Sequence, residues 1–232
     1  MSSLLTKYNS TGKKDMTITS NTIVRNGMPF IGKVLRQVAP FMDKMIITIS
    51  VNSKDGTIDE IIQVAKEYPE KVMVLFENVS TPKELTRIRN EQVRITTTDW
   101  ILFLDDDDYW TEEELKKCLN ELDKDNTILS YFVNPYQMVD FQSFDTGWKN
   151  RYFAKFLRRD GLKFIHPFPK DVPADKDGRQ LFWKKHPQTK RLPYRFYHLQ
   201  NLKSGSFRTE SWAQKYKTVI KKILPLENKL VI

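Results

Sequence analysis

Cysteine is almost absent from this sequence, because Cys118 is the only one among 232 residues. A single cysteine forms no intramolecular disulfide, and it cannot build a zinc cluster or a redox pair. Long apolar runs are absent too, since no stretch approaches the roughly eighteen residues that would span a bilayer. The first fifteen residues are polar and lack the apolar segment of a secretory signal. These absences predict a soluble, cytoplasmic protein with a flexible N-terminus over residues 1–15.

The chain has enough apolar residues for one core, together with an uneven charge. Hydrophobic residues make up 40% of the sequence, which at this length predicts one domain over residues 16–232. Residues 1–146 carry 17 Lys/Arg and 23 Asp/Glu, whereas residues 147–232 carry 21 and 6. The basic half favours an anionic partner such as a nucleotide diphosphate, an acidic acceptor, a membrane surface or nucleic acid. A solvated basic face is the structural alternative.

Strand and helix patterns alternate over the first hundred residues. Short apolar or β-branched runs predict strands at Met16–Val24, Lys44–Val51, Lys71–Glu77 and Trp100–Leu104. Amphipathic patterns between them predict helices at Phe30–Val38, Ile58–Tyr68 and Pro82–Ile95. This order predicts an α/β fold with a mostly parallel central sheet flanked by helices. Ligands of such sheets lie at the carboxyl ends of the strands, which brings together the loops at 25–28, 52–57 and 105–110.

The second half of the sequence is less regular. Thr111 is predicted to cap a helix that has three glutamates in its first turn. Ile128–Val139 and Arg151–Arg158 predict strands. Residues 164–195 are rich in proline, lysine and aspartate and predict a loop, whereas Lys215–Leu224 predicts a short basic helix.

Four consecutive aspartates, Asp105–Asp108, directly follow the apolar run W-I-L-F-L. Their mutual repulsion at the end of a strand destabilises the fold unless a cation screens it. Carboxylate oxygens suit Mg²⁺ or Mn²⁺, which bind through one or two carboxylates together with the phosphates of a substrate. The run therefore predicts a metal site, and a solvated acidic turn is the alternative.

Four segments, in order, carry a resemblance to a known family. Thr22–Asn26 (T-I-V-R-N) is similar to the family's opening motif, and Ser53–Thr57 (S-K-D-G-T) is similar to its S-T-D-G-T turn. Arg89-Asn90 lies where the family has R-N on its third helix. Residues 99–108 (D-W-I-L-F-L-D-D-D-D) resemble its D-W-I-L-F-L-D-A-D-D. On these motifs the chain resembles the family 2 glycosyltransferases, which have the nucleotide-diphospho-sugar transferase fold, called GT-A.

The resemblance implies a Rossmann-like GT-A single domain. Residues 16–110 would form the nucleotide-sugar-binding half, and residues 111–232 the acceptor-side half with the basic C-terminal region. Asp105 and Asp107 correspond to the D-x-D pair, and His198 lies in a segment that resembles the family's late Y-H motif, whose histidine closes over the metal. A satisfied core histidine is the alternative for His198.

The implied cofactor is Mn²⁺ or Mg²⁺, which stabilises the negative charge on the departing diphosphate. For Asp55, the alternative to a contact with the nucleotide-sugar is a purely structural role in organising its turn. The residues expected to contact the nucleotide-sugar are Arg25, Asn26, Asp55, Arg89, Asp105 and Asp106.

The chain departs from the family pattern at three places. Gly27 stands where the family has an acidic residue. Ser50–Asn52 lacks the acid that hydrogen-bonds uracil, so a GDP-sugar is an alternative to the expected UDP-sugar donor. No general base is evident, although an inverting reaction needs a carboxylate near the acceptor hydroxyl. Asp171 is the candidate, and Asp175 and Asp177 lie in the same predicted loop.

The sequence thus predicts a metal-dependent hexosyltransferase that transfers a sugar, with inversion, to a glycan, lipid-linked or protein acceptor. The aromatic residues of the basic half are expected to bind the acceptor, with core packing as the alternative. A catalytically inactive nucleotide-sugar-binding protein remains open because Gly27 and Val51 break the pattern. A metal-dependent nucleic-acid-binding protein also remains open, although nucleic acid is not the expected partner. The basic half also allows a peripheral contact with an anionic surface.

Overall fold

A computed structural model describes residues 16–167, 172–182, 185–202 and 220–222. These residues form one α/β domain around a ten-stranded sheet. The helices are α1 (Ile31–Val38), α2 (Thr57–Glu67), α3 (Pro82–Ile95) and α4 (Glu112–Leu119), with 3-10 turns η1 (Ala39–Phe41), η2 (Thr146–Trp148) and η3 (Gln200–Leu202). The strands up to the acidic run are β1 (Ile18–Val24), β2 (Lys44–Ser50), β3 (Val72–Glu77) and β4 (Trp100–Phe103). The later strands of this sheet are β5 (Asp108–Tyr109), β6 (Ser130–Asp140), β7 (Ser143–Asp145), β8 (Phe153–Arg158), β11 (Thr189–His198) and β12 (Ile220–Lys222).

The first half of the chain builds the parallel part of the sheet. Strand β1 lies between β2 and β4, and β3 pairs with the outer side of β2, all in parallel register. The predicted strands and helices of this half agree with the observed ones to within a few residues. Helix α3 begins as predicted, because Thr81 and Glu84 form a reciprocal capping box and Pro82 occupies the first turn.

The second half is largely antiparallel, so the sheet is mixed and the prediction of a mostly parallel sheet is confirmed only in part. Strand β8 pairs antiparallel with both β4 and β6, and β7 pairs antiparallel with β6. Only β11 runs parallel to β6 there. Parallel neighbours need a long crossover, usually a helix. The chain from β6 to β8 passes only through β7 and η2, so it reverses direction.

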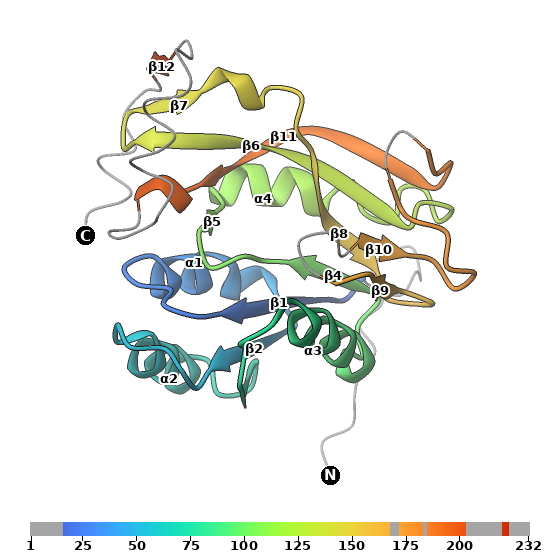
Figure 1. The fold of residues 1–232 in the computed structure, drawn as a ribbon. Coiled ribbons are helices and arrows are strands. Elements are labelled where there is room, and N and C mark those ends of the chain that lie inside the picture. The colour runs from blue at the N-terminus through green and yellow to red at the C-terminus, as the bar shows by residue number, and fades with distance from the viewer. Residues whose placement is uncertain (1–15, 168–171, 183–184, 203–219, 223–232) are drawn as a thin grey trace.

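The sheet curls around two helices (Figure 1). Helix α4 lies between the layer of β6 and β11 and the layer that holds β1 and β4, with α1 beside it. Helix α3 covers the opposite face of the parallel strands, next to β9 (Lys163–Ile165). The curl brings β11, near the end of the described chain, over the acidic run that follows β4.

Two predictions for the C-terminal half are wrong in part. The segment 164–195, predicted as loop, contains most of a two-stranded sheet of β9 and β10 (Val172–Ala174) and the first residues of β11. Residues 220–222 of the predicted helix form strand β12, and the rest of that prediction lies outside the described residues. Short strands in a proline- and lysine-rich stretch have too few alternating positions to produce a periodic signal.

One core joins both halves of the chain. Its buried side chains include Ile47 and Trp100 from the parallel strands, Cys118 from α4, and Phe156 and Phe196 from β8 and β11. The buried position of Cys118 agrees with a structural rather than a reactive thiol. No helix in the described part of the chain is long and apolar enough to cross a membrane.

Candidate metal and nucleotide site

The acidic run forms a tight turn at the carboxyl end of β4. The backbone N–H of Asp105 donates to Oδ2 of Asp108 (3.1 Å), and the N–H of Asp108 donates to the carbonyl of Asp105 (3.1 Å). The side chains of Asp107 and Asp108 are buried, with 7% and 0% of their surface exposed. The turn therefore holds two carboxylates inside the protein rather than presenting all four to solvent.

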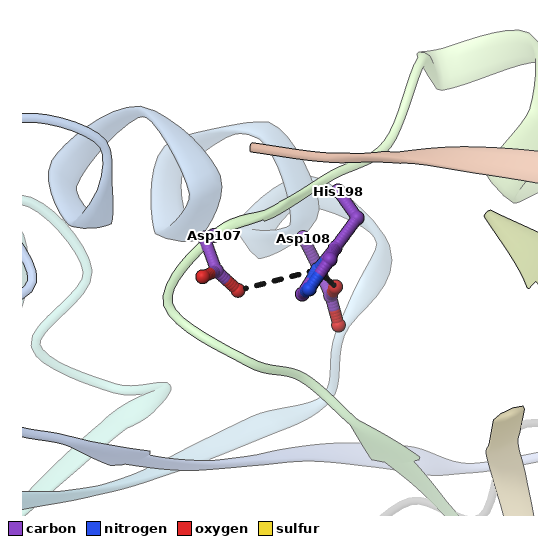
Figure 2. Close-up of side chains that lie close together, drawn as sticks. All are labelled: Asp107, Asp108 and His198. Carbon is purple, nitrogen blue, oxygen red and sulfur yellow. Dashed lines mark hydrogen bonds and ion pairs between the residues drawn. The ribbon is translucent and has the colours of Figure 1, made fainter. Parts of the chain in front are cut away.

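His198 reaches this turn through strand β11. Residue 198 lies opposite Asp108 in the antiparallel pairing of β11 with β5. Its Nδ1 lies 3.0 Å from Oδ1 of Asp108 and 3.4 Å from Oδ1 of Asp107 (Figure 2). The N–H of Leu199 donates to the carbonyl of Asp107 (2.8 Å), which fixes the turn against the strand.

Among the described residues, Asp107, Asp108 and His198 form a group that could hold a metal ion. Their ligand atoms lie within 4.8 Å of one another. Burial raises the pKa of Asp108 above its usual value. Burial lowers the pKa of His198, but the Asp107 carboxylate and the hydrogen bond to Asp108 raise it to about 9. A divalent cation bound by this group would therefore compete with the proton of His198.

Asp105 lies outside this group and pairs with Lys155 instead. Nζ of Lys155 lies 2.8 Å from Oδ2 of Asp105 and also forms an ion pair with Asp108. Burial raises the pKa of Asp105, but nearby positive charges, that of Lys155 foremost, outweigh this effect, so the pKa lies below its usual range. The prediction paired Asp105 with Asp107 as metal ligands. The structure instead places Asp108 beside Asp107 and His198, because the turn directs Asp105 toward β8.

Arg89 is partly buried behind the acidic run. Its guanidinium carbon lies 4.5 Å from the centre of the Phe103 ring and 5.5 Å from that of Phe164. Burial lowers its pKa, and the charge of Asp105 opposes that shift. The positive charge of Arg89 thus acts on Asp105 from beside the acidic run, and packing on two aromatic rings holds its side chain there.

The two other predicted loops lie side by side at the same end of the sheet. Oδ2 of Asp55 accepts from the N–H of Met28 (3.0 Å), and its Oδ1 accepts from the hydroxyl of Thr57 (2.5 Å). Oδ1 of Asn26 accepts from the N–H of Lys54 (2.9 Å). Asp55 and Asn26, both predicted to contact the nucleotide, are therefore engaged in holding the loops together, whereas Arg25 is exposed.

The crowding around Gly27 explains why this position departs from the family pattern. A Cβ atom at this position would lie 2.6 Å from Cγ2 of Val24 and 3.0 Å from both Oδ2 of Asp106 and Cβ of Ile31. The position lies against the acidic run, so an acidic side chain would meet both a steric barrier and a carboxylate. This contact also places Asp106 next to the loop that follows β1.

We expect Gly27→Ala to lower the free energy of unfolding by about 1–3 kcal/mol, because the added methyl group overpacks this contact. Urea denaturation of the variant would measure the loss. Val24→Ala and the double variant Val24→Ala/Gly27→Ala complete a mutant cycle, since Gly27→Ala should cost less stability when Cγ2 of Val24 is absent. Equal stability of Gly27→Ala and the unchanged protein would contradict the crowding.

The predicted base, Asp171, lies outside the described residues. Asp175 is buried, and its carboxylate accepts from Nε of Arg179 (2.7 Å) and contacts Nε2 of His186 (3.3 Å). Burial raises the pKa of Asp175, but the hydrogen bonds from Arg179 lower it to about 2. Asp177 is exposed and pairs with Arg179 (3.1 Å). Asp175 therefore has a structural role in its turn.

A comparison with protein families identifies the chain. Residues 26–171 match the model of glycosyl transferase family 2, which is more than half of the sequence. The chain belongs to glycosyl transferase family 2. This membership agrees with the predicted GT-A fold, and the match includes Asp105–Asp108 and Lys155 but ends before His198. No protein of curated function matches the sequence of this family 2 member.

Several solved glycosyltransferases are similar to this family 2 chain in fold. The mannosyltransferase PcManGT from Pyrobaculum calidifontis, in complex with GDP-Man and Mn²⁺, is 18% identical with a TM-score of 0.43, over 50% of this chain and 34% of that one. TarS 1-349 of S. aureus, in complex with UDP, is 18% identical with a TM-score of 0.43, over 53% of this chain and 36% of that one. GalNAc-T7 with UDP, GalNAc and Mn²⁺ is 12% identical with a TM-score of 0.44, over 53% of this chain and 24% of that one. The chain thus spans about a third or less of each.

Reasoning from the sequence missed Asp108 as a member of the candidate metal group and missed Lys155, whereas Phe153 was among the aromatic residues expected to bind the acceptor. Asp108 was part of the acidic run, but the D-x-D pattern drew attention to Asp105 and Asp107. Lys155 and Phe153 lie on β8, where a two-residue spacing puts both side chains on one face of the strand. The ring of Phe153 lies 6.5 Å from that of His198. The F-A-K alternation was the available signal, but nothing local linked it to the acidic run.

Proposed function

We propose that this family 2 member is a metal-dependent glycosyltransferase that transfers a sugar from a nucleotide-diphosphate donor to an acceptor. The observation that carries the proposal is the group of Asp107, Asp108 and His198 at the carboxyl end of β4. This is the end of an α/β sheet where ligands bind. Family membership supplies the reaction class, and the group supplies a place for the cation that such a reaction uses.

The three side chains fit a transition metal better than magnesium. Two carboxylates supply oxygen ligands, and the imidazole of His198 supplies nitrogen, which Mn²⁺ accepts more readily than Mg²⁺ does. When bound, the ion would stabilise the negative charge on the departing diphosphate. The protein holds the three ligands through the turn of the acidic run and through the pairing of β5 with β11.

The donor is proposed to lie over the loops that follow β1 and β2. Arg25 is exposed there and can face a phosphate, whereas Asn26 and Asp55 fix the backbone of the two loops. Asn52 donates from its side-chain amide to that of Asn78 (2.8 Å), so amide groups stand where the family has its base-binding acid. We therefore propose both UDP- and GDP-sugars as candidate donors.

The acceptor is proposed to lie on the β8 side of the site. Phe153 is 40% exposed and its ring is stacked with that of His198, so it offers an apolar face to a sugar ring next to the candidate metal group. Inversion, with Asp171 as the base that accepts the proton of the acceptor hydroxyl, remains part of the proposal. So do a cytoplasmic location and a contact of the basic half with an anionic acceptor or surface.

A thermal-shift screen tests this function. UDP- and GDP-sugars would be added with Mn²⁺ or with EDTA, because a ligand that binds only the folded state raises its melting temperature. We expect one nucleotide to raise the melting temperature by about 5–10 °C at a hundred times its Kd, and only with the metal. The control is the same nucleotide with EDTA.

Two outcomes of the screen would favour the alternatives. One outcome is a metal-dependent rise in melting temperature while no nucleotide diphosphate is released, either to an acceptor or by hydrolysis. That result would indicate a catalytically inactive nucleotide-sugar-binding protein. No shift with any donor, together with steeply salt-dependent binding to DNA or RNA, would indicate a nucleic-acid-binding protein.

A further inference from the structure

Lys155 is an enclosed cation at the base of the acidic run. Its side chain is 2% exposed, and its Nζ contacts a carboxylate oxygen of Asp105 and one of Asp108. The same Nζ lies 5.0 Å from the centre of the Phe196 ring. A buried ammonium group is tolerated only where opposite charges compensate its loss of hydration. Lys155 and the acidic run therefore stabilise each other without any bound ion.

Asp108 connects this lysine to the candidate metal group. Its Oδ2 is paired with Lys155, and its Oδ1 lies 3.0 Å from Nδ1 of His198. The charge of one carboxylate is thus shared between a protein cation and the place proposed for a divalent ion. Because two positive charges that share a buried carboxylate repel each other, Lys155 weakens the attraction of this group for a metal.

We propose that Lys155 is the resident counter-cation of the acidic run and makes binding of the divalent ion depend on the diphosphate of the donor. The inference rests on the proposed function. In the absence of nucleotide, Lys155 already neutralises part of the run, so Asp107, Asp108 and His198 hold the ion weakly. The negative charge of a nucleotide diphosphate restores the attraction, and the protein binds the ion and the nucleotide together.

Calorimetric titration of the full chain with Mn²⁺, without nucleotide, tests the role of Lys155. Lys155→Met keeps an unbranched side chain that is one atom shorter and removes its charge. We expect this variant to bind Mn²⁺ about ten-fold more tightly than the unchanged protein. We also expect UDP or GDP to increase its Mn²⁺ affinity less. A purely structural lysine would give the opposite sign, since a disturbed site binds the ion more weakly.

A charge-compensated variant guards against misfolding of Lys155→Met. Asp105→Asn alone removes one of the two carboxylates that neutralise Lys155, so Mn²⁺ binding should weaken several-fold. The double variant Asp105→Asn/Lys155→Met should restore the Mn²⁺ affinity to near that of the unchanged protein. If Asp105 were itself a ligand, the double variant would stay weak. Circular dichroism of each variant would confirm that the fold is kept.

The outcomes separate this inference from the proposed function. If the unchanged protein binds Mn²⁺ equally well with and without nucleotide diphosphate, or if Lys155→Met binds it no more tightly, the role of Lys155 is wrong and the function stands. If neither the unchanged protein nor any variant binds Mn²⁺ with UDP or GDP present, both the metal-dependent function and the inference fail.

Discussion

Asp107→Asn is expected to remove metal-dependent binding of the donor while leaving the fold intact. The substitution keeps the shape of the side chain and takes away one of two buried carboxylates beside His198. Loss of a partner that only supports a metal ligand costs about 10–100-fold in affinity. Loss of a ligand itself should cost at least that much, in Mn²⁺ affinity measured with nucleotide present and in turnover.

The matched control for this variant is Asp160→Asn, which removes one negative charge from an exposed turn after β8. It should bind Mn²⁺ and nucleotide as the unchanged protein does. Calorimetry in the presence of the stabilising nucleotide would compare the two variants. Unaltered Mn²⁺ binding by Asp107→Asn would remove Asp107 from the metal group and leave the acidic run as a structural turn.

The largest effect on stability is expected at Trp110. Its side chain is fully buried, stacks on the ring of Phe196 (centres 5.0 Å apart, planes at 24°) and meets the edge of Phe156 (5.7 Å). Trp110→Ala would leave a large cavity between the acidic turn, β8 and β11. We expect a loss of about 3–5 kcal/mol in the free energy of unfolding, measured by urea denaturation.

Trp110→Phe is the control for this substitution, because it keeps an aromatic ring against Phe196 and should cost clearly less. Since the same packing holds the strand that carries His198, Trp110→Ala should also weaken Mn²⁺ binding at temperatures where the protein remains folded. A loss below about 1 kcal/mol would mean that the neighbouring strands collapse to fill the space, and that the indole does not fix the site.

The parallel half of the fold could be predicted because its signals are local. Strands β2 and β4 are short runs of mostly buried apolar residues, and α3 carries its own capping box at Thr81 and Glu84. The antiparallel half could not be predicted with the same success. Strands β5 and β12 have two and three residues, and their pairing depends on β11 and β7, which lie far away along the chain. Reading such pairs requires knowledge of the tertiary fold.

The candidate site could be predicted in composition but not in detail. Charge repulsion among the four aspartates pointed to the acidic run, and the order of the family motifs pointed to His198. The structure brings the two together. Which carboxylates face the imidazole depends on one turn, and the backbone N–H of Asp105 selects Oδ2 of Asp108 in that turn. Lys155 could not be anticipated, because its ion pairs join residues 47 and 50 positions apart.

The pairing of β5 with β11 also sets the order in which the site is completed as the chain is made. His198 is 90 positions beyond Asp108, and synthesis at about 5–20 residues per second separates the two by roughly 5–20 s. Lys155 lies 47 positions beyond Asp108, so it follows about halfway through that interval and can neutralise the aspartates for the remainder. A nascent chain would therefore keep its acidic turn compact well before it acquires the imidazole that completes the group.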